Sequence, residues 1–290
     1  MREFLVSLYA FFFDKVLRKH LAMKKYLRRN YAELIQEFQR RPVVSAAVES
    51  AYSLWFCWWQ GAEKMPEMVK ACYQALCQNA NGHTVKLITK DNYQNFVKLP
   101  PFLTDKLAQG LISLTHFSDI LRMYLLYEHG GLWLDATILV TAPLPSFAGL
   151  DIFTIRRRRS DLHVGRGRWT AYLFYLAKGN LLADFMKTIF TEYWRRETKM
   201  LDYFLVDYCI ATAYGNIPAI RQMLDAVPYS NENIYALKHK LGAAYDAQIF
   251  AEICRTNYLH KLTWKEKFPK RVGGKLTFYG KITSAQYKVK

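Results

Sequence analysis

Short apolar runs separated by amphipathic stretches make up most of the chain after residue 50. The runs suit buried strands because they are brief and rich in aromatic and β-branched residues; they lie at 53–59, 83–89, 132–135, 137–140, 151–155 and 170–177. The stretches between them begin or end at proline or glycine, as helices do; they lie at 66–79, 102–110 and 116–131, and helices dominate from 181 to 255. This alternation predicts an α/β fold, with a mixed, mainly parallel sheet flanked by helices and a helical C-terminal half.

The N-terminal residues 1–45 form a separate pattern, ahead of a domain that we place at 46–290. Residues 4–13 are apolar, and residues 14–29 carry seven lysines and arginines. As a helix, the apolar part would be about 15 Å long, which is half a bilayer. We therefore expect a helix lying in the interface of an anionic membrane, at its cytoplasmic face. A helix packed on the protein's own core, or on a second copy, is the alternative.

Composition and charge narrow the class of protein. The chain has 290 residues, of which 51% are hydrophobic, so it can bury a large core and is not disordered. Its net charge of +17 attracts polyanions, but no helix-turn-helix, RNA-binding or zinc motif accompanies that charge. We therefore expect no nucleic-acid partner. Five scattered cysteines, without the spacing of a metal site, favour a reduced, cytosolic setting.

A polar stripe crosses the apolar helix expected at 116–131. Ser118, Asp119 and Arg122 fall within about 100° of its circumference at 3.6 residues per turn. Asp119 and Arg122 are three residues apart and can pair, as buried charges must. Two interpretations follow: an ion pair that orients the helix, or a carboxylate and a guanidinium that hold the hydroxyl and phosphate groups of a ligand.

The same helix leads through Gly130 and Gly131 into a short strand that ends at Asp135. Two glycines permit a sharp turn with positive φ. Ligands of open α/β sheets bind at the carboxyl ends of strands, so Asp135 is expected at a binding edge. A divalent cation carrying a diphosphate would satisfy this carboxylate. An Asp that caps the following turn is the alternative.

The segment "HFSDILRMYLLYEHGGLWLDAT" (116–137) resembles the central motif of bacterial capsular polysaccharide synthesis glycosyltransferases. These are similar to fungal initiating α-1,6-mannosyltransferases and to the catalytic domains of glucosylating toxins, in which a Ser-Asp-x-x-Arg helix precedes Gly-Gly and an Asp-x-Asp motif. "WFCWWQG" (55–61) resembles the first strand of the family, "VKLITKDNY" (85–93) the second strand and its loop, and "HKLTWK" (260–265) the C-terminal motif. The resemblance spans about residues 53–265 and implies a Rossmann-like, GT-A type nucleotide-sugar glycosyltransferase.

The resemblance also implies roles for single residues. It gives donor-binding roles to Gln60, Gly61, Ser118, Asp119, Arg122, Gly131 and Lys261. Asp135 matches the first acid of Asp-x-Asp, which contacts ribose, sugar and metal-bound water, whereas Thr137 replaces the second acid with a neutral, weaker ligand. The expected cation, Mn²⁺ or Mg²⁺, would be held by Asp135, Thr137 and His260 with the diphosphate oxygens, or basic residues such as Lys261 would replace it in part.

The implied reaction transfers a hexosyl residue from a nucleotide-diphosphate sugar to a glycan or lipid-linked saccharide acceptor in surface polysaccharide synthesis, with retention of configuration. Asp207 is the further acid considered for catalysis, with a helix-surface or capping Asp as the alternative. The arginine-rich segment 156–168 is expected to bind an anionic acceptor or lipid headgroups, or to be a solvated loop. Because Thr137 departs from the motif, a catalytically silent glycosyltransferase-like binding subunit is the competing function.

Overall fold

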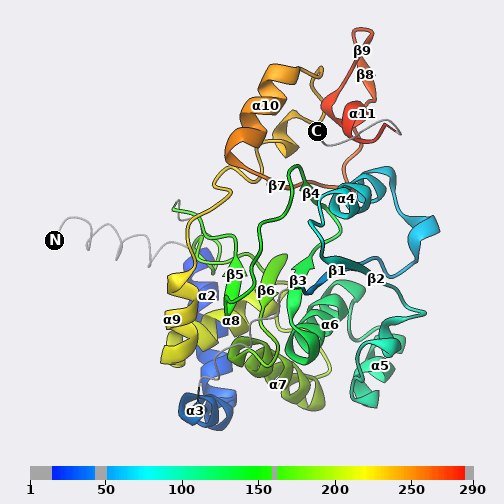
Figure 1. Cartoon of the computed structure of the whole chain (residues 1–290). Helices are drawn as coiled ribbons and strands as arrows, with labels where there is room; N and C mark the ends of the chain where they lie inside the picture. Colours follow the sequence, from blue (N-terminus) through cyan, green and yellow to red (C-terminus); the bar gives the residue numbers. More distant parts are fainter. Residues whose placement is uncertain (1–14, 43–50, 159–161, 285–290) are drawn as a thin grey trace, which may run out of the picture.

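The computed structural model describes residues 15–42, 51–158 and 162–284 (Figure 1), and it confirms the expected α/β class. The central sheet has the order β2-β1-β3-β6-β5, with β1 (Ser53–Cys57), β2 (Thr84–Ile88), β3 (Gly131–Leu134), β5 (Ile152–Thr154) and β6 (Leu173–Leu176). β1 is parallel to β2 and β3, and β6 alone runs against its neighbours, so this sheet is mixed and mainly parallel. The helices around it are α2 (Lys15–Asn30), α3 (Ala32–Arg40), α4 (Glu67–Gln78), α5 (Pro101–Ala108), α6 (Leu114–His129), α7 (Leu181–Arg196), α8 (Leu205–Asn216) and α9 (Pro218–Ala226).

Helices cover both faces of the sheet. α4 connects β1 to β2, and α6 leads to β3 on the other side of β1, so right-handed connections place the two helices on opposite faces. Neighbouring side chains of β1 agree with this, because side chains of a strand alternate between its faces. Phe56 contacts Tyr73 of α4, whereas Trp55 contacts His129 of α6. The carboxyl ends of β1 and β3 are thereby left free of helices that would cover them.

Beyond α9, the chain returns to this carboxyl edge. β7 (Leu259–Lys261) pairs antiparallel with β4 (Ile138–Val140), the short strand that follows β3. The Leu262 N–H donates to the Thr137 carbonyl oxygen at 2.8 Å, so the last part of the chain lies beside the turn after β3. The remaining elements lie together at the top of Figure 1, near α4; they are α10 (Ala247–Thr256), β8 (Arg271–Val272), β9 (Lys275–Leu276) and α11 (Phe278–Ile282).

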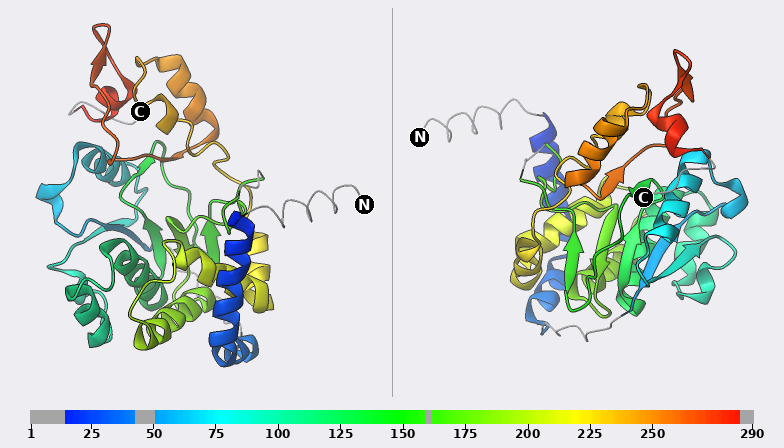
Figure 2. Two further views of the ribbon diagram at one scale, coloured as in Figure 1. Left: turned by 180° about the vertical axis from the view of Figure 1, so that it is seen from behind. Right: turned by 45° about the horizontal axis from the view of Figure 1, so that its top comes forward.

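The basic N-terminal helix packs on the protein itself. α2 and α3 lie against α8 (Figure 2), and their buried Leu27, Tyr31, Ile35 and Phe38 belong to the same hydrophobic core as the sheet. The packed-helix alternative thus describes α2 and α3. The apolar segment 4–13, on which the membrane prediction depends, lies outside the described residues. In the described ranges, no helix has the length and apolarity needed to cross a bilayer.

The glycine pair before β3 lets that strand pack directly against β1. Gly131 has a φ of +103°, and a Cβ added to it would lie 2.3 Å from the Ser53 carbonyl oxygen of β1. Gly130, with a φ of +67°, is the C-cap of α6. The pair therefore turns the chain from helix to strand at the amino end of β3, which is the opposite end from Asp135.

The substitution Gly131→Ala should lower the free energy of unfolding by on the order of 3 kcal/mol, because backbone strain adds to the overlap with β1. The matched control is Gly179→Ala, where φ is also positive (+71°) but no atom lies within 4 Å of the added Cβ. Only backbone strain, about 1 kcal/mol, is expected there. Urea denaturation measures both losses. Equal losses would show that the close approach to β1 does not constrain residue 131.

Candidate functional site

A cleft of about 500 Å³ opens at the carboxyl edge of the sheet. Its walls come from the loop after β1, the first turns of α6, the turn after β3 and the segment that includes the end of β7, with Tyr203 added from the loop before α8. Three of the sequence motifs, far apart along the chain, therefore meet in one hollow. The edge at which they meet is the one where open α/β sheets bind ligands.

Asp135 lies in this cleft directly after β3. Its Oδ1 accepts hydrogen bonds from Arg122 Nη2 at 3.1 Å and from Trp133 Nε1 at 3.0 Å, and its Oδ2 accepts one from Lys261 Nζ at 3.1 Å. The side chain is 32% exposed, so part of the carboxylate still faces the cleft. The turn-capping alternative does not hold, since these contacts are to side chains of other elements and of β3.

The contacts of Asp135 also set its charge. Burial by itself would raise the pKa of this carboxyl group, but Lys261, Arg122 and the Trp133 N–H outweigh burial and hold the pKa below its usual value. Asp135 is therefore ionised at neutral pH. An ionised carboxylate beside two cations is a strong acceptor for ligand hydroxyl groups and a poor general acid.

Arg122 connects the core of α6 to Asp135. It is 2% exposed, and its Nη2 lies 3.1 Å from Asp119 Oδ1 and 3.1 Å from Asp135 Oδ1. Its Nη1 donates to the Ala171 carbonyl oxygen, and the Trp133 ring centroid lies 5.0 Å from the guanidinium carbon. Asp119 is also buried and does not line the cleft. The ion-pair interpretation thus describes Asp119, while Arg122 additionally holds the cleft carboxylate.

Lys261 reaches the cleft because β7 pairs with β4. Within that pair Lys261 is opposite Ile138, three residues beyond Asp135. Its ammonium group lies 3.1 Å from Asp135 Oδ2 and 4.7 Å from the centroid of the Tyr172 ring. The side chain is partly exposed, so Lys261 presents a positive charge to whatever enters the cleft.

Aromatic rings form part of the cleft; the sequence offered the tryptophan cluster as stacking faces for sugars, with core packing as the alternative, but named none of these rings as a site residue. Trp58 and Trp264 meet edge to face with centroids 5.5 Å apart, and Trp59 packs on Phe117 at 5.2 Å. The available signal was their position inside three of the motifs, because each stands within four residues of a predicted site residue. Flat, rigid rings suit contact with the faces of sugars and bases.

Three further predicted residues line the cleft: Gln60, Ser118 and Thr137. Gly61 follows Gln60 with a φ of +89°, so it turns the loop after β1. The Ser118 hydroxyl donates to the Thr115 carbonyl oxygen at 2.6 Å, which fixes it on the cleft side of α6. The structure thus brings these residues together with Asp135 and Lys261.

His260 lies away from the cleft, contrary to the predicted position of a metal ligand. It is fully buried, and its Nε2 lies 3.0 Å from Thr141 Oγ1 and 3.8 Å from Cys254 Sγ. Burial lowers the pKa of His260 to about 4, so the ring is neutral. The physical reason for its position is the alternation of strand side chains: Lys261 faces the cleft, and its neighbour must face the other way.

The donor set of the cleft does not fit a metal site built by the protein. Among the residues that the structure describes, no group of three or more His, Cys, Asp or Glu could hold a metal ion. Of the described residues that line the cleft, Asp135 is the single acid, and it already accepts from three donors. Thr137 adds only a neutral hydroxyl. These residues leave any divalent cation largely dependent on oxygens from a ligand.

Asp207 and Gly131 also lie outside the cleft lining. Asp207 is 4% exposed; its Oδ1 accepts from Trp169 Nε1 at 3.0 Å, and its Oδ2 lies 3.4 Å from His163 Nε2. Asp207 therefore does not line the cleft, and it is not a surface or capping residue. It holds the segment before β6 in place through Trp169 and His163. Gly131 serves the packing of β3 on β1.

The comparison with protein families agrees with the motifs. The model of a family described as "Capsular polysaccharide synthesis protein" matches residues 13–282, a range that includes α2 and α3, which the sequence motifs had left outside. Among solved structures, the chain is similar to one titled "PaToxG Glycosyltransferase", with 13% identity and a TM-score of 0.44, over 84% of this chain and 99% of that chain. No curated protein matches. Because the family model spans most of its length, the chain belongs to the capsular polysaccharide synthesis protein family.

Proposed function

We propose that this protein is a glycosyltransferase that moves a hexosyl residue from a nucleotide-diphosphate sugar to a glycan acceptor in surface polysaccharide synthesis. The observation that carries the proposal is the ionised Asp135, held by Arg122 and Lys261 in a tryptophan-lined cleft at the carboxyl edge of the sheet. Such an edge is where α/β enzymes bind nucleotides. Membership of the family supplies the biological setting.

The cations of the cleft suit the chemistry of the leaving group. When the bond between the anomeric carbon and the phosphate oxygen breaks, the electron pair stays on the diphosphate, whose negative charge grows. The Lys261 ammonium, fixed by Asp135 and Tyr172, stabilises that charge without reorganising. Arg122 is too buried to reach the donor, so its part is to position Asp135. The exposed portion of Asp135 accepts hydrogen bonds from donor hydroxyl groups.

We propose a retaining reaction in which the acceptor hydroxyl oxygen bonds to the anomeric carbon on the face from which the diphosphate leaves, and its proton passes to the departing phosphate oxygen. Among the described residues that line the cleft, Asp135 is the one carboxylate, and its three hydrogen-bond donors make it a poor nucleophile. A double displacement through a glycosyl-aspartate is therefore disfavoured. Trp58 and Trp264 would exclude water from the anomeric carbon and order the acceptor beside it.

The substitution Asp135→Asn should reduce nucleotide-sugar hydrolysis and transfer by at least about 100-fold, since the positioned charge is lost. The asparagine oxygen still accepts from Arg122 and Trp133, so the fold should remain intact. Asp105→Asn, an exposed acid on α5, is the matched control. The measurement is release of nucleoside diphosphate across a panel of nucleotide sugars that thermal shift has first screened. Equal activity of both variants would contradict the proposed role of Asp135.

A silent binding subunit is the second candidate, and Thr137 favours it because the second acid of the motif is missing. The same panel separates the two functions. Donors that raise the melting temperature but are never turned over, with glycan or lipid-linked saccharide acceptors present, would favour the silent subunit. Release of the diphosphate that depends on Asp135 would favour the transferase.

We propose that a divalent cation, if used, arrives bound to the diphosphate of the donor. The substitution Thr137→Asp would then create a second acid in the cleft and increase Mn²⁺ affinity by about tenfold or more, because a carboxylate is a much stronger ligand than a hydroxyl group. Thr137→Asn, of similar size and neutral, is the control. Isothermal titration with Mn²⁺, without donor, is the measurement. Tight binding by the wild-type protein would contradict the proposal.

We also propose that the protein is peripheral at the cytoplasmic face of the membrane, through the apolar residues 4–13. Deletion of residues 1–13 ends before α2 and so spares the packed helices. The deletion should weaken liposome binding, because less apolar surface is buried in the bilayer. High salt should not weaken the binding of the full-length protein in this way. Unchanged binding in a liposome flotation assay would exclude this anchor.

A further inference from the structure

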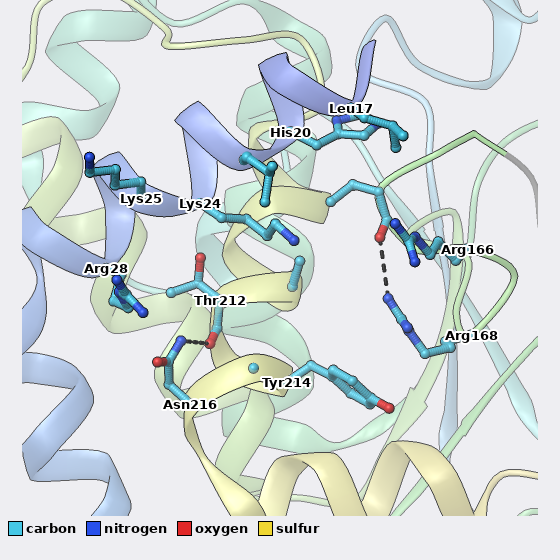
Figure 3. Close-up of a pocket in the computed structure, with 14 residues that line it drawn as sticks. Leu17, His20, Lys24, Lys25, Arg28, Arg166, Arg168, Thr212, Tyr214 and Asn216 are labelled. Carbon is cyan, nitrogen blue, oxygen red and sulfur yellow. Dashed lines mark hydrogen bonds between the residues drawn. The ribbon is translucent and has the colours of Figure 1, made fainter. Parts of the chain in front are cut away.

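A second cavity, of about 820 Å³, lies between α2, the loop before β6 and the end of α8. It shares no lining residue with the cleft. Figure 3 shows α2 along one side, Arg166 and Arg168 of the loop on the other, and Thr212, Tyr214 and Asn216 of α8 between them. The cavity is therefore built from three segments that no motif of the sequence linked.

In the part of the chain that the structure describes, five cationic side chains line this cavity and no carboxylate does. They are Lys24, Lys25 and Arg28 of α2, with Arg166 and Arg168 of the loop. Among the described residues, none of the five has a carboxylate within ion-pair distance. Some other basic residues of the same segments are paired: Lys19 with Asp202, Arg156 with Asp225 and Arg158 with Glu232. The cavity thus brings together five cations that no described carboxylate neutralises.

The cations of the cavity repel one another. The pKa of Lys24 is lowered by burial and then by the charges of Arg166 and Arg168, and the pKa of Arg168 is lowered by burial and, further, by Arg166. Figure 3 shows the Lys24 side chain extending from α2 toward these two arginines. An anion placed among them would relieve this repulsion, whereas the empty cavity leaves it uncompensated.

The walls are held rigidly in this arrangement. His20 of α2 bonds through Nδ1 to the Tyr208 hydroxyl at 2.7 Å and through Nε2 to the Leu162 carbonyl oxygen at 2.8 Å. Asp207 bonds to Trp169 and contacts His163, which ties the loop to α8. Both basic walls are therefore preorganised, which lowers the entropic cost of binding.

Apolar side chains form part of the remaining lining, beside the polar His20, Thr212 and Asn216. Leu17, Leu21, Val164 and Ala211 contribute aliphatic surface, and the Tyr214 ring lies 4.7 Å from the Arg168 guanidinium carbon. Cations beside aliphatic surface match a ligand that has an anionic head and an apolar part.

We propose that this cavity binds the phosphate or diphosphate head of an amphipathic ligand, such as a lipid phosphate. The inference does not rest on the transferase proposal, because it concerns other residues and is tested by binding. Asp207 is then a positioning residue of this site: it holds the loop that carries Arg166 and Arg168. Arg156 and Arg158, which the sequence also offered for an anion, are neutralised elsewhere.

The test compares two double variants that remove the same charge. Lys24→Gln/Arg166→Gln alters the cavity, and Lys70→Gln/Lys98→Gln alters exposed lysines on α4 and in the loop after β2. One probe is inorganic pyrophosphate, followed by thermal shift; the other is phosphatidylcholine liposomes with or without phosphatidate, followed by flotation. The cavity variant should bind phosphatidate liposomes about tenfold or more weakly than wild type, and the control variant should bind nearly as wild type.

The two probes distinguish the sources of the phosphate. Loss of liposome binding in the cavity variant alone supports a lipid phosphate. Loss of only the pyrophosphate shift in that variant supports a soluble phosphate compound; pyrophosphate bound in the cleft would shift both variants equally. Equal losses in both variants, or no response of wild type to either probe, would overturn the proposal.

Folding defects are not expected in the cavity variant, because removing repelling cations should keep or raise its melting temperature without ligand. Should it nevertheless fold poorly, Arg28→Gln/Arg166→Gln alters two exposed cavity residues and carries the same prediction.

Discussion

The need to pair one partly buried carboxylate governs the arrangement of the carboxyl edge of the sheet. Asp135 takes a cation from α6 and a cation from the end of β7, together with an indole N–H from its own strand. The contacts that keep the helix, the sheet and the C-terminal segment together are therefore the same contacts that shape the cleft.

Four side chains form successive ion pairs from the core to the cleft, with alternating charge; they are Asp119, Arg122, Asp135 and Lys261. Each of these side chains is held by an ion pair with the next one. The Lys261 ammonium group is therefore already oriented before a ligand binds. Preorganised charges of this kind are what stabilises a leaving diphosphate. The proposed reaction thus depends on an ion-pair network whose inner pair, Asp119 and Arg122, has a structural role.

Asp207, a buried acid, has a comparable role at the other cavity of the molecule. It holds no ligand group itself, but it fixes the segment that carries two of the cavity arginines. The positive charge of the chain is consequently not spread evenly over its surface. Lys19, Arg156 and Arg158 form ion pairs, whereas five cations without a described carboxylate partner lie together where α2 meets α8.

The sequence predicted the α/β class, the mainly parallel sheet and the position of Asp135 at a strand end, because these depend on local spacing and on the turns that glycine and proline impose. It also carried the motifs of the family. It did not predict the short strands β7, β8 and β9. The tertiary structure decided which neighbouring side chain faces the cleft: Lys261 does and His260 does not, because the short β7 pairs with β4 in one register only. It likewise decided that Trp58 meets Trp264 and that Lys24 faces Arg166, since contacts between distant segments leave no periodic signal along the chain.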